Sequence, residues 1–373
     1  MRNISDTIAR LKSAQGIAYA RGPAPASRLS ELGEFGTNPG SLRAYSYIPE
    51  DLPGHAPLVV VLHGCTQTAA GYDHGSGWSQ LADRHGFALL YPEQQRANNP
   101  NLCFNWFVPE DIGRNAGEAL SIAQMVGRMV ELHGLDRRRV FVTGLSAGGA
   151  MTSVMLATYP ELFAGGAILA GLPYGCATSI PEAFDRMRGH GIPSERELEA
   201  RVRGASGHQG PWPTLSIWHR SADQTVAHAN MEAIVAQWRG VHGMQHTKPE
   251  QNAIGPHTRG VWRDGAGAAR IEAFSVAGMG HGTPLSGADD IGAPGAFMLD
   301  AGISSTRHIA RFWQLTETGS ELSLPSHAER ATPEPGSERL GGRRAAAFTP
   351  GRGPALGVGK VIEDALRAAG LMR

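Results

Sequence analysis

Apolar residues along this chain follow two different periods, and stretches of the two kinds alternate. Short runs that are apolar at nearly every position are typical of strands buried on both faces of a parallel sheet. Apolar residues three or four positions apart are typical of helices that bury one face. The strand-like stretches are residues 42–48, 58–62, 87–91, 139–143, 166–170, 214–218, 257–262 and 270–276. The helical stretches are residues 78–85, 117–133, 150–157, 227–238 and 305–315. This alternation predicts right-handed βαβ units in a mainly parallel sheet with helices on both faces.

One strand-like stretch runs directly into a motif with a chemical meaning. Residues 139–143 are followed by Gly-Leu-Ser-Ala-Gly at 144–148 and then by a helical run. Strand, sharp turn and helix are the context that a G-x-S-x-G nucleophile elbow requires. The glycines permit a turn too tight for Cβ atoms beside the serine. We therefore expect Ser146 to lie exposed at the end of a strand, with the Ala147 N–H free at the positive end of a helix.

A second strand ends in residues that suit the other half of an oxyanion hole. The apolar run at 58–62 leads into His63-Gly64-Cys65. In serine hydrolases with an elbow, a backbone N–H from a neighbouring strand end faces the nucleophile. The position and chain order make the Cys65 amide the best candidate for this donor.

The predicted body is interrupted once and flanked by segments of different composition. The body spans residues 41–316, and residues 178–210 break its apolar rhythm with charges, glycines and prolines, which predicts an insertion over the strand ends. Residues 1–40 begin with a short amphipathic helical pattern and continue as a linker. Residues 317–355 are rich in Pro, Gly, Arg and Ser, which predicts a flexible linker, and residues 356–373 again have amphipathic helical spacing.

Charge and composition exclude several classes of function. Lys and Arg together number 34, as do Asp and Glu, so no net charge favours nucleic acid or an anionic membrane. No apolar run is long enough to span a bilayer, and the N-terminal residues lack the apolar core of a signal peptide. These features predict a soluble, cytoplasmic protein.

The three cysteines are Cys65, Cys103 and Cys176. They are too few for a disulfide framework, and their spacing is not that of a metal site. We expect thiols in a reducing cytoplasm.

A serine nucleophile needs a base, and the base needs an acid that orients it. In α/β-hydrolases the chain order is serine, acid, histidine, with the last two in loops after late strands. Asp223 follows the strand at 214–218, and His281 follows the strand at 270–276 inside a Gly-Met-Gly-His-Gly loop. Other candidates remain at this point: His219, His228 and His257 for the base, and Asp264, Asp289 and Asp290 for the acid.

Several motifs together resemble one esterase family. They are His-Gly-Cys-Thr-Gln at 63–67, Tyr-Pro-Glu-Gln at 91–94, Cys-Phe-Asn-Trp-Phe at 103–107, Gly-Leu-Ser-Ala-Gly-Gly at 144–149, Gly-Leu-Pro-Tyr-Gly at 171–175 and Gly-Met-Gly-His-Gly at 278–282. The set resembles the catalytic domain of type 1 poly(3-hydroxybutyrate) depolymerases over residues 40–315. Feruloyl and acetylxylan esterases share part of it. One departure is Arg220, which stands where relatives commonly have Gly and leaves open how the turn before Asp223 forms.

The resemblance implies the fold, the reaction and the residues that perform it. The fold is that of the α/β-hydrolases, and the reaction is hydrolysis of short-chain polyhydroxyalkanoate or its oligomers through an acyl-enzyme. The implied residues are the nucleophile Ser146, the acid Asp223, the base His281, the oxyanion donors Cys65 and Ala147, and the acyl-side aromatic residues Trp106, Phe104 and Phe107. An aromatic cluster is also typical of a protein core, so both interpretations of these three residues stay open. Cys65 and Cys103 recur as a pair in the family, which implies a disulfide where the compartment allows one.

No metal or organic cofactor is implied. The expected partner is a polyester granule or a hydroxyalkanoate oligomer, with the amphipathic ends of the chain as candidates for granule contact or oligomerisation. Two alternatives stand beside this prediction. One is a carbohydrate esterase that removes feruloyl or acetyl groups. The other is a non-catalytic granule-associated protein, which the intact set of triad and oxyanion residues disfavours.

Overall fold

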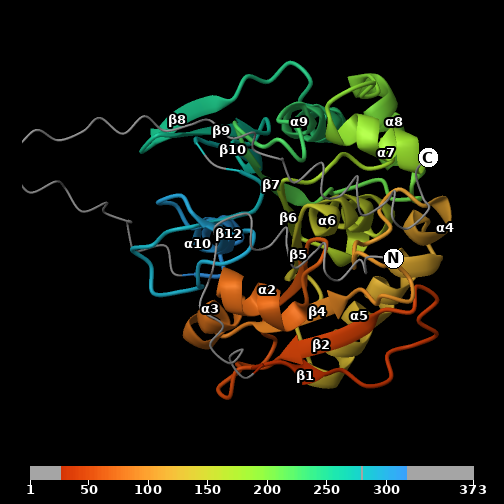
Figure 1. The fold of residues 1–373 in the computed structure, drawn as a ribbon, viewed down its shortest axis with the longest axis vertical. Helices are drawn as coiled ribbons and strands as arrows, with labels where there is room; N and C mark the ends of the chain where they lie inside the picture. The colour runs from red at the N-terminus through yellow and green to blue at the C-terminus, as the bar shows by residue number, and fades with distance from the viewer. Residues whose placement is uncertain (1–26, 279, 317–373) are drawn as a thin grey trace, which may run out of the picture.

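A computed structural model describes residues 27–278 and 280–316, and its centre is one mixed sheet (Figure 1). The strands are β1 (Ser30–Glu31), β2 (Arg43–Tyr47), β3 (Leu58–Leu62), β4 (Ala88–Glu93), β5 (Val140–Leu145), β6 (Gly165–Leu169), β7 (Thr214–Arg220), β8 (Glu250–Ile254), β9 (His257–Arg263) and β10 (Ala269–Val276). Their order in the sheet is β1-β2-β4-β3-β5-β6-β7-β10-β9-β8. From β4 to β10 all neighbours are parallel, and two antiparallel strands follow on each side. A separate pair, β11 (Thr283–Leu285) and β12 (Met298–Asp300), is also parallel.

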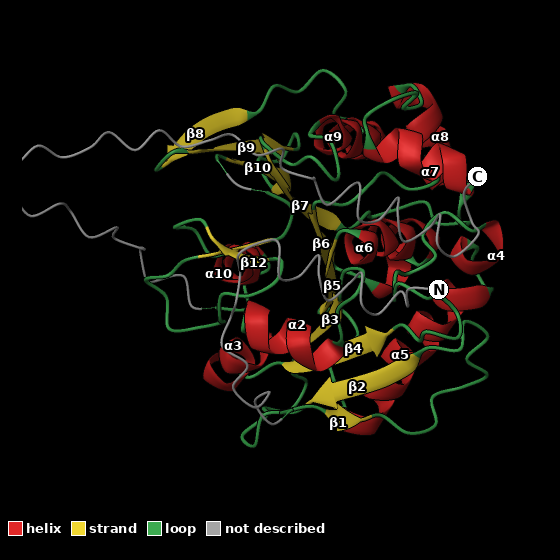
Figure 2. Cartoon of the chain, viewed as in Figure 1, coloured by secondary structure: helices red, strands yellow, loops and turns green. Residues whose placement is uncertain are grey.

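Helices cover both faces of the sheet, as Figure 2 shows. They are α2 (Ala69–Ser76), α3 (Trp78–His85), α4 (Pro109–Ile112), α5 (Gly117–His133), α6 (Ala147–Thr158), α7 (Ile180–Met187), α8 (Glu195–Gly204), α9 (Ala229–Val241) and α10 (Ser305–Phe312), with a 3₁₀ turn at Pro160–Leu162. Helices α5, α6 and α9 pack on one face, and α2, α3 and α10 on the other. Helix α5 ends at Gly134, whose φ of 59° is the left-handed conformation that terminates many helices.

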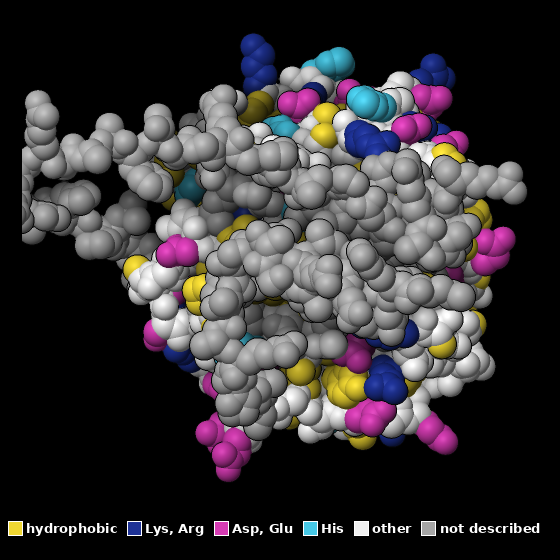
Figure 3. Space-filling view, viewed as in Figure 1, with side chains coloured by type: hydrophobic (Ala, Val, Ile, Leu, Met, Phe, Trp, Pro, Cys, Tyr) yellow, Lys and Arg dark blue, Asp and Glu magenta, His cyan; other side chains and the backbone are white. Residues whose placement is uncertain are grey.

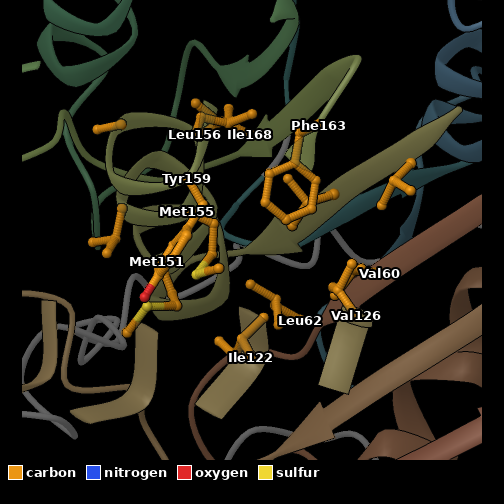
Figure 4. Packing of buried hydrophobic residues seen from close by; sticks show 14 of the residues in the cluster. Val60, Leu62, Ile122, Val126, Met151, Met155, Leu156, Tyr159, Phe163 and Ile168 are labelled. Atoms are coloured by element: carbon orange, nitrogen blue, oxygen red, sulfur yellow. The ribbon is translucent and has the colours of Figure 1, made fainter. Parts of the chain in front are cut away.

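Two apolar cores lie on the two faces of the sheet because side chains alternate along each strand. In β3, Leu58, Val60 and Leu62 belong to the core beneath α5 and α6, whereas Val59 and Val61 belong to the core beneath α2 and α3. Figure 4 shows the first core, where Val60 and Leu62 face side chains from α5 and α6 such as Ile122 and Met151. All five residues of β3 are buried, which explains why this strand has no polar position.

This architecture confirms the predicted α/β-hydrolase fold and most of the predicted elements. The pattern missed α2, whose sequence AAGYDHGS has no apolar stripe, and β8, whose residues are polar and mostly exposed. Residues 178–210 do fall between two sheet strands, β6 and β7, where they form α7 and α8. The amphipathic patterns at residues 1–16 and 356–373 and the linker at 317–355 lie outside the described residues.

Basic and acidic side chains are mixed rather than separated on the described surface seen in Figure 3. They also pair across it, as in the ion pairs Arg28–Asp83 and Arg263–Glu250. Within residues 27–278 and 280–316, no helix is both long and apolar enough to cross a membrane.

Candidate active site

Ser146 lies between β5 and α6 in a conformation that few residues adopt. Its φ is 58° and its ψ is −117°, which for a residue with a Cβ costs about 1–3 kcal/mol. The neighbouring glycines make this turn possible by close approach: a Cβ on Gly144 would overlap the Gly148 backbone, and a Cβ on Gly148 would overlap the carbonyl oxygens of Leu62 and His63. The Ser146 N–H donates to Leu169 O at 2.8 Å, which ties the elbow to β6. The structure thus has the strand, turn and helix that the motif predicted.

Asp223 and His281 meet beyond the ends of β7 and β10, although 58 positions separate them in the chain. His281 Nδ1 lies 2.7 Å from Asp223 Oδ2, and both side chains are buried. The other carboxylate oxygen, Oδ1, accepts the N–H groups of Thr225 and Val226 at 2.8 and 2.9 Å. Since a carboxylate can only accept, the proton on the ring lies on Nδ1 and leaves Nε2 as the basic atom.

The electrostatic environment keeps Asp223 ionised. Burial raises the pKa of Asp223, but the hydrogen bond and the charge of His281 outweigh burial, so the pKa lies below its ordinary value. His281 Nε2 is buried and has no hydrogen-bond partner among the described residues, Ser146 Oγ included. Catalytic hydrogen bonds of this type often tighten only when substrate is bound.

The other histidines considered from the sequence have different partners. His257 Nδ1 accepts the Ala277 N–H, and its Nε2 contacts Ala301 O. His228 Nε2 lies 3.2 Å from Ser275 Oγ. His219 is buried, and its Nε2 contacts Val226 O at 2.8 Å. Burial lowers the pKa of His219 to about 4, so the ring is neutral and donates from Nε2. It therefore supports the loop that carries the acid.

The other acids are also engaged elsewhere. Asp264 pairs with Arg270 at 2.6 Å, Asp290 with Arg84 at 2.8 Å and Asp289 with Arg307 at 3.1 Å. Among the described residues, Asp223 and His281 are the one pair of candidate acid and candidate base that hydrogen-bond to each other.

Arg220 is a residue of this site that sequence reasoning did not assign. It ends β7, its side chain is buried, and Nη1 donates to the carbonyl of Gly280, the residue before His281. Burial lowers the pKa of Arg220 to about 10, while the charge of Asp223 raises it, so the guanidinium remains protonated at neutral pH. The turn before Asp223 thus forms with an arginine in it, and that arginine holds the loop of the base. The sequence signals were a charged residue at the end of an apolar strand and its departure from the Gly that is common in relatives, and neither indicated a contact with the His281 loop.

The amides of Cys65 and Ala147 have no acceptor among the described residues, as oxyanion donors require. The loop around Cys65 is fixed by its neighbours: the Gly64 N–H donates to Gln67 Oε1 at 2.8 Å, and the Thr66 N–H donates to Asn101 O at 2.7 Å. The positive end of α6 lies at Ala147, which favours negative charge there.

Cys65 and Cys103 form a disulfide, which confirms the pairing that the resemblance implied and shows that the expectation of thiols is wrong for this pair. The sequence argument rested on compartment, whereas the fold places the two Cα atoms 4.2 Å apart. Cys176 is a free, buried thiol, and burial raises its pKa to about 12. The bond links the oxyanion loop to the aromatic segment 103–107.

The three aromatic residues of that segment have different surroundings. Phe104 is only 1% exposed and packs in the core beneath α5 and α6. The centroid of its ring lies 5.0 Å from the centroid of the His63 ring. Phe104 therefore supports the loop around Cys65 and has no free surface for substrate. Trp106 and Phe107 pack edge to face at 5.1 Å. They belong to an apolar cluster with Ala147 and with Leu198 of the insertion. This mostly buried cluster lies beside the elbow, because Ala147 belongs to it.

Within the described residues, no three His, Cys, Asp or Glu side chains converge as metal ligands would. A serine hydroxyl, an imidazole with a carboxylate behind it and two backbone N–H groups without acceptors are the kinds of group that acyl transfer uses.

Comparison with known proteins identifies relatives of this arrangement. A poly(3-hydroxyalkanoate) depolymerase C from Paucimonas lemoignei is 47% identical over 76% of this chain and 70% of that protein. Feruloyl esterase B from Talaromyces stipitatus is 33% identical over 69% of this chain and 73% of that protein. Among solved structures, an acetyl xylan esterase from Aspergillus awamori is similar with a TM-score of 0.67 and 26% identity, covering 77% of this chain and 99% of that one.

The family model described as Esterase PHB depolymerase matches residues 44–260 of the 373. That range includes the elbow, the oxyanion loop and Asp223, and it ends before His281. With this match over more than half of its length and a relative of 47% identity, the chain belongs to the Esterase PHB depolymerase family.

Proposed function

We propose that this protein is a serine esterase that hydrolyses short-chain polyhydroxyalkanoate, poly(3-hydroxybutyrate) or its oligomers. The observation that carries the proposal is the 2.7 Å contact between Asp223 and His281, in a chain 47% identical to a polyhydroxyalkanoate depolymerase. A carboxylate that orients a histidine is the arrangement that a general base in acyl transfer uses.

The chemistry is that of acyl transfer. His281 Nε2 accepts the Ser146 hydroxyl proton while Oγ attacks the ester carbonyl, and the Cys65 and Ala147 amides stabilise the oxyanion. His281 then gives its proton to the leaving alkoxide, which departs as the hydroxyl end of the shortened chain. Water deprotonated by His281 next hydrolyses the acyl-enzyme to a carboxylic acid and restores Ser146. Asp223 stabilises the imidazolium at each step.

The apolar cluster of Trp106 and Phe107 beside Ala147 supports an acyl group with a short alkyl side chain. Phe104 is left out of this surface because it is buried in the core.

The test is release of 3-hydroxybutyrate from amorphous granules by the wild type and by Ser146→Ala, with p-nitrophenyl butyrate and methyl ferulate as small esters. We expect Ser146→Ala to lose about 10⁵–10⁶-fold in kcat on every ester that the wild type cleaves. The matched control is Ser153→Ala. Ser153 is on the same helix and donates to Leu172 O at 2.8 Å, so its loss should lower stability and leave turnover intact. Granule hydrolysis that persists in Ser146→Ala would refute the proposal.

A carbohydrate esterase is the second candidate, because feruloyl and acetylxylan esterases are 32–34% identical to this chain. The same assay separates the two. Turnover of methyl ferulate with intact granules would select the carbohydrate ester.

We propose further that the polymer is met as a granule in the cytoplasm, and that the amphipathic patterns at 1–16 and 356–373 contact the granule or a second copy. This rests on sequence pattern alone. Deleting either segment should reduce co-sedimentation with granules without changing turnover of p-nitrophenyl butyrate, and unchanged co-sedimentation of both truncations would contradict it.

The Cys65–Cys103 bond makes the location testable, because disulfides are rare in reducing cytoplasm. Recovery of the protein in the cytoplasmic fraction with the bond intact would support the proposal, and recovery outside the cytoplasm would contradict it.

A further inference from the structure

Glu118 is a buried carboxyl group that the proposed mechanism does not use. It lies in the first turn of α5 and is 1% exposed. Oε1 accepts Gln94 Nε2–H at 2.5 Å, and Oε2 accepts the Asn105 N–H at 2.9 Å. No Lys or Arg among the described residues pairs with it. Burying a carboxyl group without a cation is unfavourable. If Glu118 served only to fill space, an apolar residue at this position would make the fold more stable.

Gln94 connects this carboxyl to the His63 ring. The Gln94 N–H donates to His63 Nε2 at 3.1 Å, so Nε2 carries the lone pair and the ring proton lies on Nδ1. Burial lowers the pKa of His63 to about 4, which keeps the ring neutral and this tautomer in place. Nδ1 then donates to Gly64 O at 2.8 Å.

The Gly64 carbonyl belongs to the same peptide plane as the Cys65 N–H. A trans peptide is flat, with C=O and N–H pointing in opposite directions. Holding the Gly64 oxygen on one side therefore fixes where the Cys65 N–H points on the other. This N–H is one of the two amides without an acceptor beside the elbow.

A second connection from Glu118 reaches Cys65 from the opposite side. The Asn105 amide bonded to Oε2 belongs to the segment that contains Cys103, and Gln94 Nε2 also donates to Cys103 O at 3.0 Å. The disulfide then joins Cys103 to Cys65. Both sides of the oxyanion peptide are thus anchored at one carboxyl.

We propose that Glu118 is a positioning residue of the oxyanion hole, which acts through Gln94 and His63 to set the direction of the Cys65 N–H. The inference rests on the proposed function, because it concerns the same ester hydrolysis. It assigns to Glu118, Gln94 and His63 on the oxyanion side a role parallel to that of Asp223 behind His281: a fixed set of hydrogen-bond partners that holds an imidazole in one tautomer.

The experiment compares Glu118→Gln with Glu272→Gln. Glu272 is a matched control because it is also 1% exposed, but it accepts from Ser216 and Arg259 in the middle of the sheet. A carboxyl group, ionised or protonated, has an acceptor lone pair on each oxygen, whereas the amide of Glu118→Gln has only one acceptor atom. The variant therefore cannot accept from both Gln94 Nε2 and the Asn105 N–H. We expect kcat for p-nitrophenyl butyrate to fall about tenfold or more with KM unchanged, since oxyanion contacts form in the transition state. Glu272→Gln should keep kcat within about twofold.

Binding of a trifluoromethyl ketone gives a readout that a merely structural role would not move, because its hemiketal places an oxyanion in the hole. Its affinity should fall in Glu118→Gln by the same factor as kcat. A kcat that stays within about twofold in folded Glu118→Gln, or that falls equally in Glu272→Gln, overturns the proposal.

Two substitutions of His63 test the proposal if Glu118→Gln does not fold. An asparagine Nδ2 can replace the Nδ1 donor to Gly64 O, whereas a glutamine Nε2 lies at the place of the ring Nε2. We expect His63→Asn to retain about tenfold more kcat than His63→Gln, and equal losses would overturn the proposal. Ser146→Ala tested in parallel keeps the questions apart: if it remains active, the proposed function fails, whereas an inactive Ser146→Ala with an unaffected Glu118→Gln refutes only this inference.

Discussion

The two sides of the candidate active site are held by different kinds of interaction. On the oxyanion side, the loop at Cys65 is fixed by a disulfide and by hydrogen bonds among peptide groups, amides and a neutral imidazole. On the acid–base side, the loops are fixed by ions: Asp223 holds His281, and Arg220 holds the carbonyl before it.

The difference follows from what each side must do. A backbone donor stabilises developing charge best when it is already oriented and does not reorganise, so the oxyanion side benefits from rigid neutral contacts. A base must change its charge during each turnover, and a nearby carboxylate stabilises the imidazolium that forms. We expect perturbations of ions to impair proton transfer and perturbations of the oxyanion side to impair stability and transition-state binding.

The largest expected effect is on the acid–base side. Asp223→Asn replaces an acceptor by an amide that can hold His281 in the wrong tautomer, and we expect kcat to fall about 10⁴-fold. Turnover of p-nitrophenyl butyrate measures it. Asp264→Asn is the control, because Asp264 pairs with Arg270 away from the triad, and it should retain kcat within about twofold. Retention of about a tenth of the activity by Asp223→Asn would contradict the role of the acid.

The next effect concerns the covalent link on the oxyanion side. Replacing Cys65 and Cys103 together by serine opens a loop with a sequence separation of 38 residues, and we expect the free energy of unfolding to fall by about 2–4 kcal/mol. Urea unfolding of the two forms measures the change. Cys176→Ala serves for comparison because that thiol is unpaired. If the double variant unfolds at the same urea concentration as the wild type, the disulfide does not stabilise the oxyanion side and the proposed difference between the two sides is contradicted.

A smaller loss of activity is expected from Arg220→Met. The substitution keeps an apolar stem but releases the Gly280 carbonyl, so the His281 loop loses a constraint and kcat should fall about 10–100-fold. Arg220→Lys retains the charge with a single donor group, so its kcat should lie between those of the wild type and Arg220→Met. Steady-state kinetics of all three proteins decide the matter. Equal kcat values would show that Arg220 does not position the base.

The smallest expected effect is on the pH dependence of stability. Burial raises the pKa of Glu118 to about 8 from 4.5, so the folded protein binds a proton that the unfolded chain has released, and stability falls as pH rises towards 8. Between pH 6.5 and 8 this amounts to about 1–2 kcal/mol, which Glu118→Gln should remove.

At lower pH, buried histidines change the stability in the opposite direction from Glu118. Burial lowers the pKa values of His63 and His219 to about 4 from 6.5, so the unfolded chain binds more protons and stability rises from pH 4 to 6.5. Urea unfolding at half-unit steps of pH should therefore show a maximum near neutrality in the wild type. A profile that is the same in Glu118→Gln would mean that this carboxyl does not titrate in that range.

Sequence patterns predicted the parts of the structure that depend on local order. The buried run at 58–62 and the elbow at 144–148 each combine a periodicity with a turn signal, and both formed as expected. Asp223 and His281 could be selected because chain order limits which loops follow late strands, and the structure joins them. Their catalytic roles and those of Ser146, Cys65 and Ala147 stay predictions until the variants are assayed.

What the sequence could not show depends on contacts between distant segments. The Cys65–Cys103 bond depends on the path of residues 99–103 beside the oxyanion loop, which no local pattern encodes. Phe104 and Trp106 are only two positions apart, yet Phe104 packs in the core beneath α5 and α6 and Trp106 packs in the cluster with Ala147, a difference that no sequence pattern shows. Glu118 resembled an ordinary first-turn acid of a helix, and only the fold places Gln94 and Asn105 against it.

The two ends of the large sheet limit how copies of the protein can associate. Among residues 27–278 and 280–316, one edge is β1, only two residues long, and the other is β8, whose first residue Glu250 carries a charge paired with Arg263. Short or charged edge strands are poor templates for another chain, because few backbone groups are available and a charge would have to be desolvated. Joining sheets edge to edge is therefore disfavoured, both for an ordered dimer and for amyloid-like aggregation. Self-association of this esterase would instead use its helices or loops, which leaves the sheet that supports Ser146 unchanged.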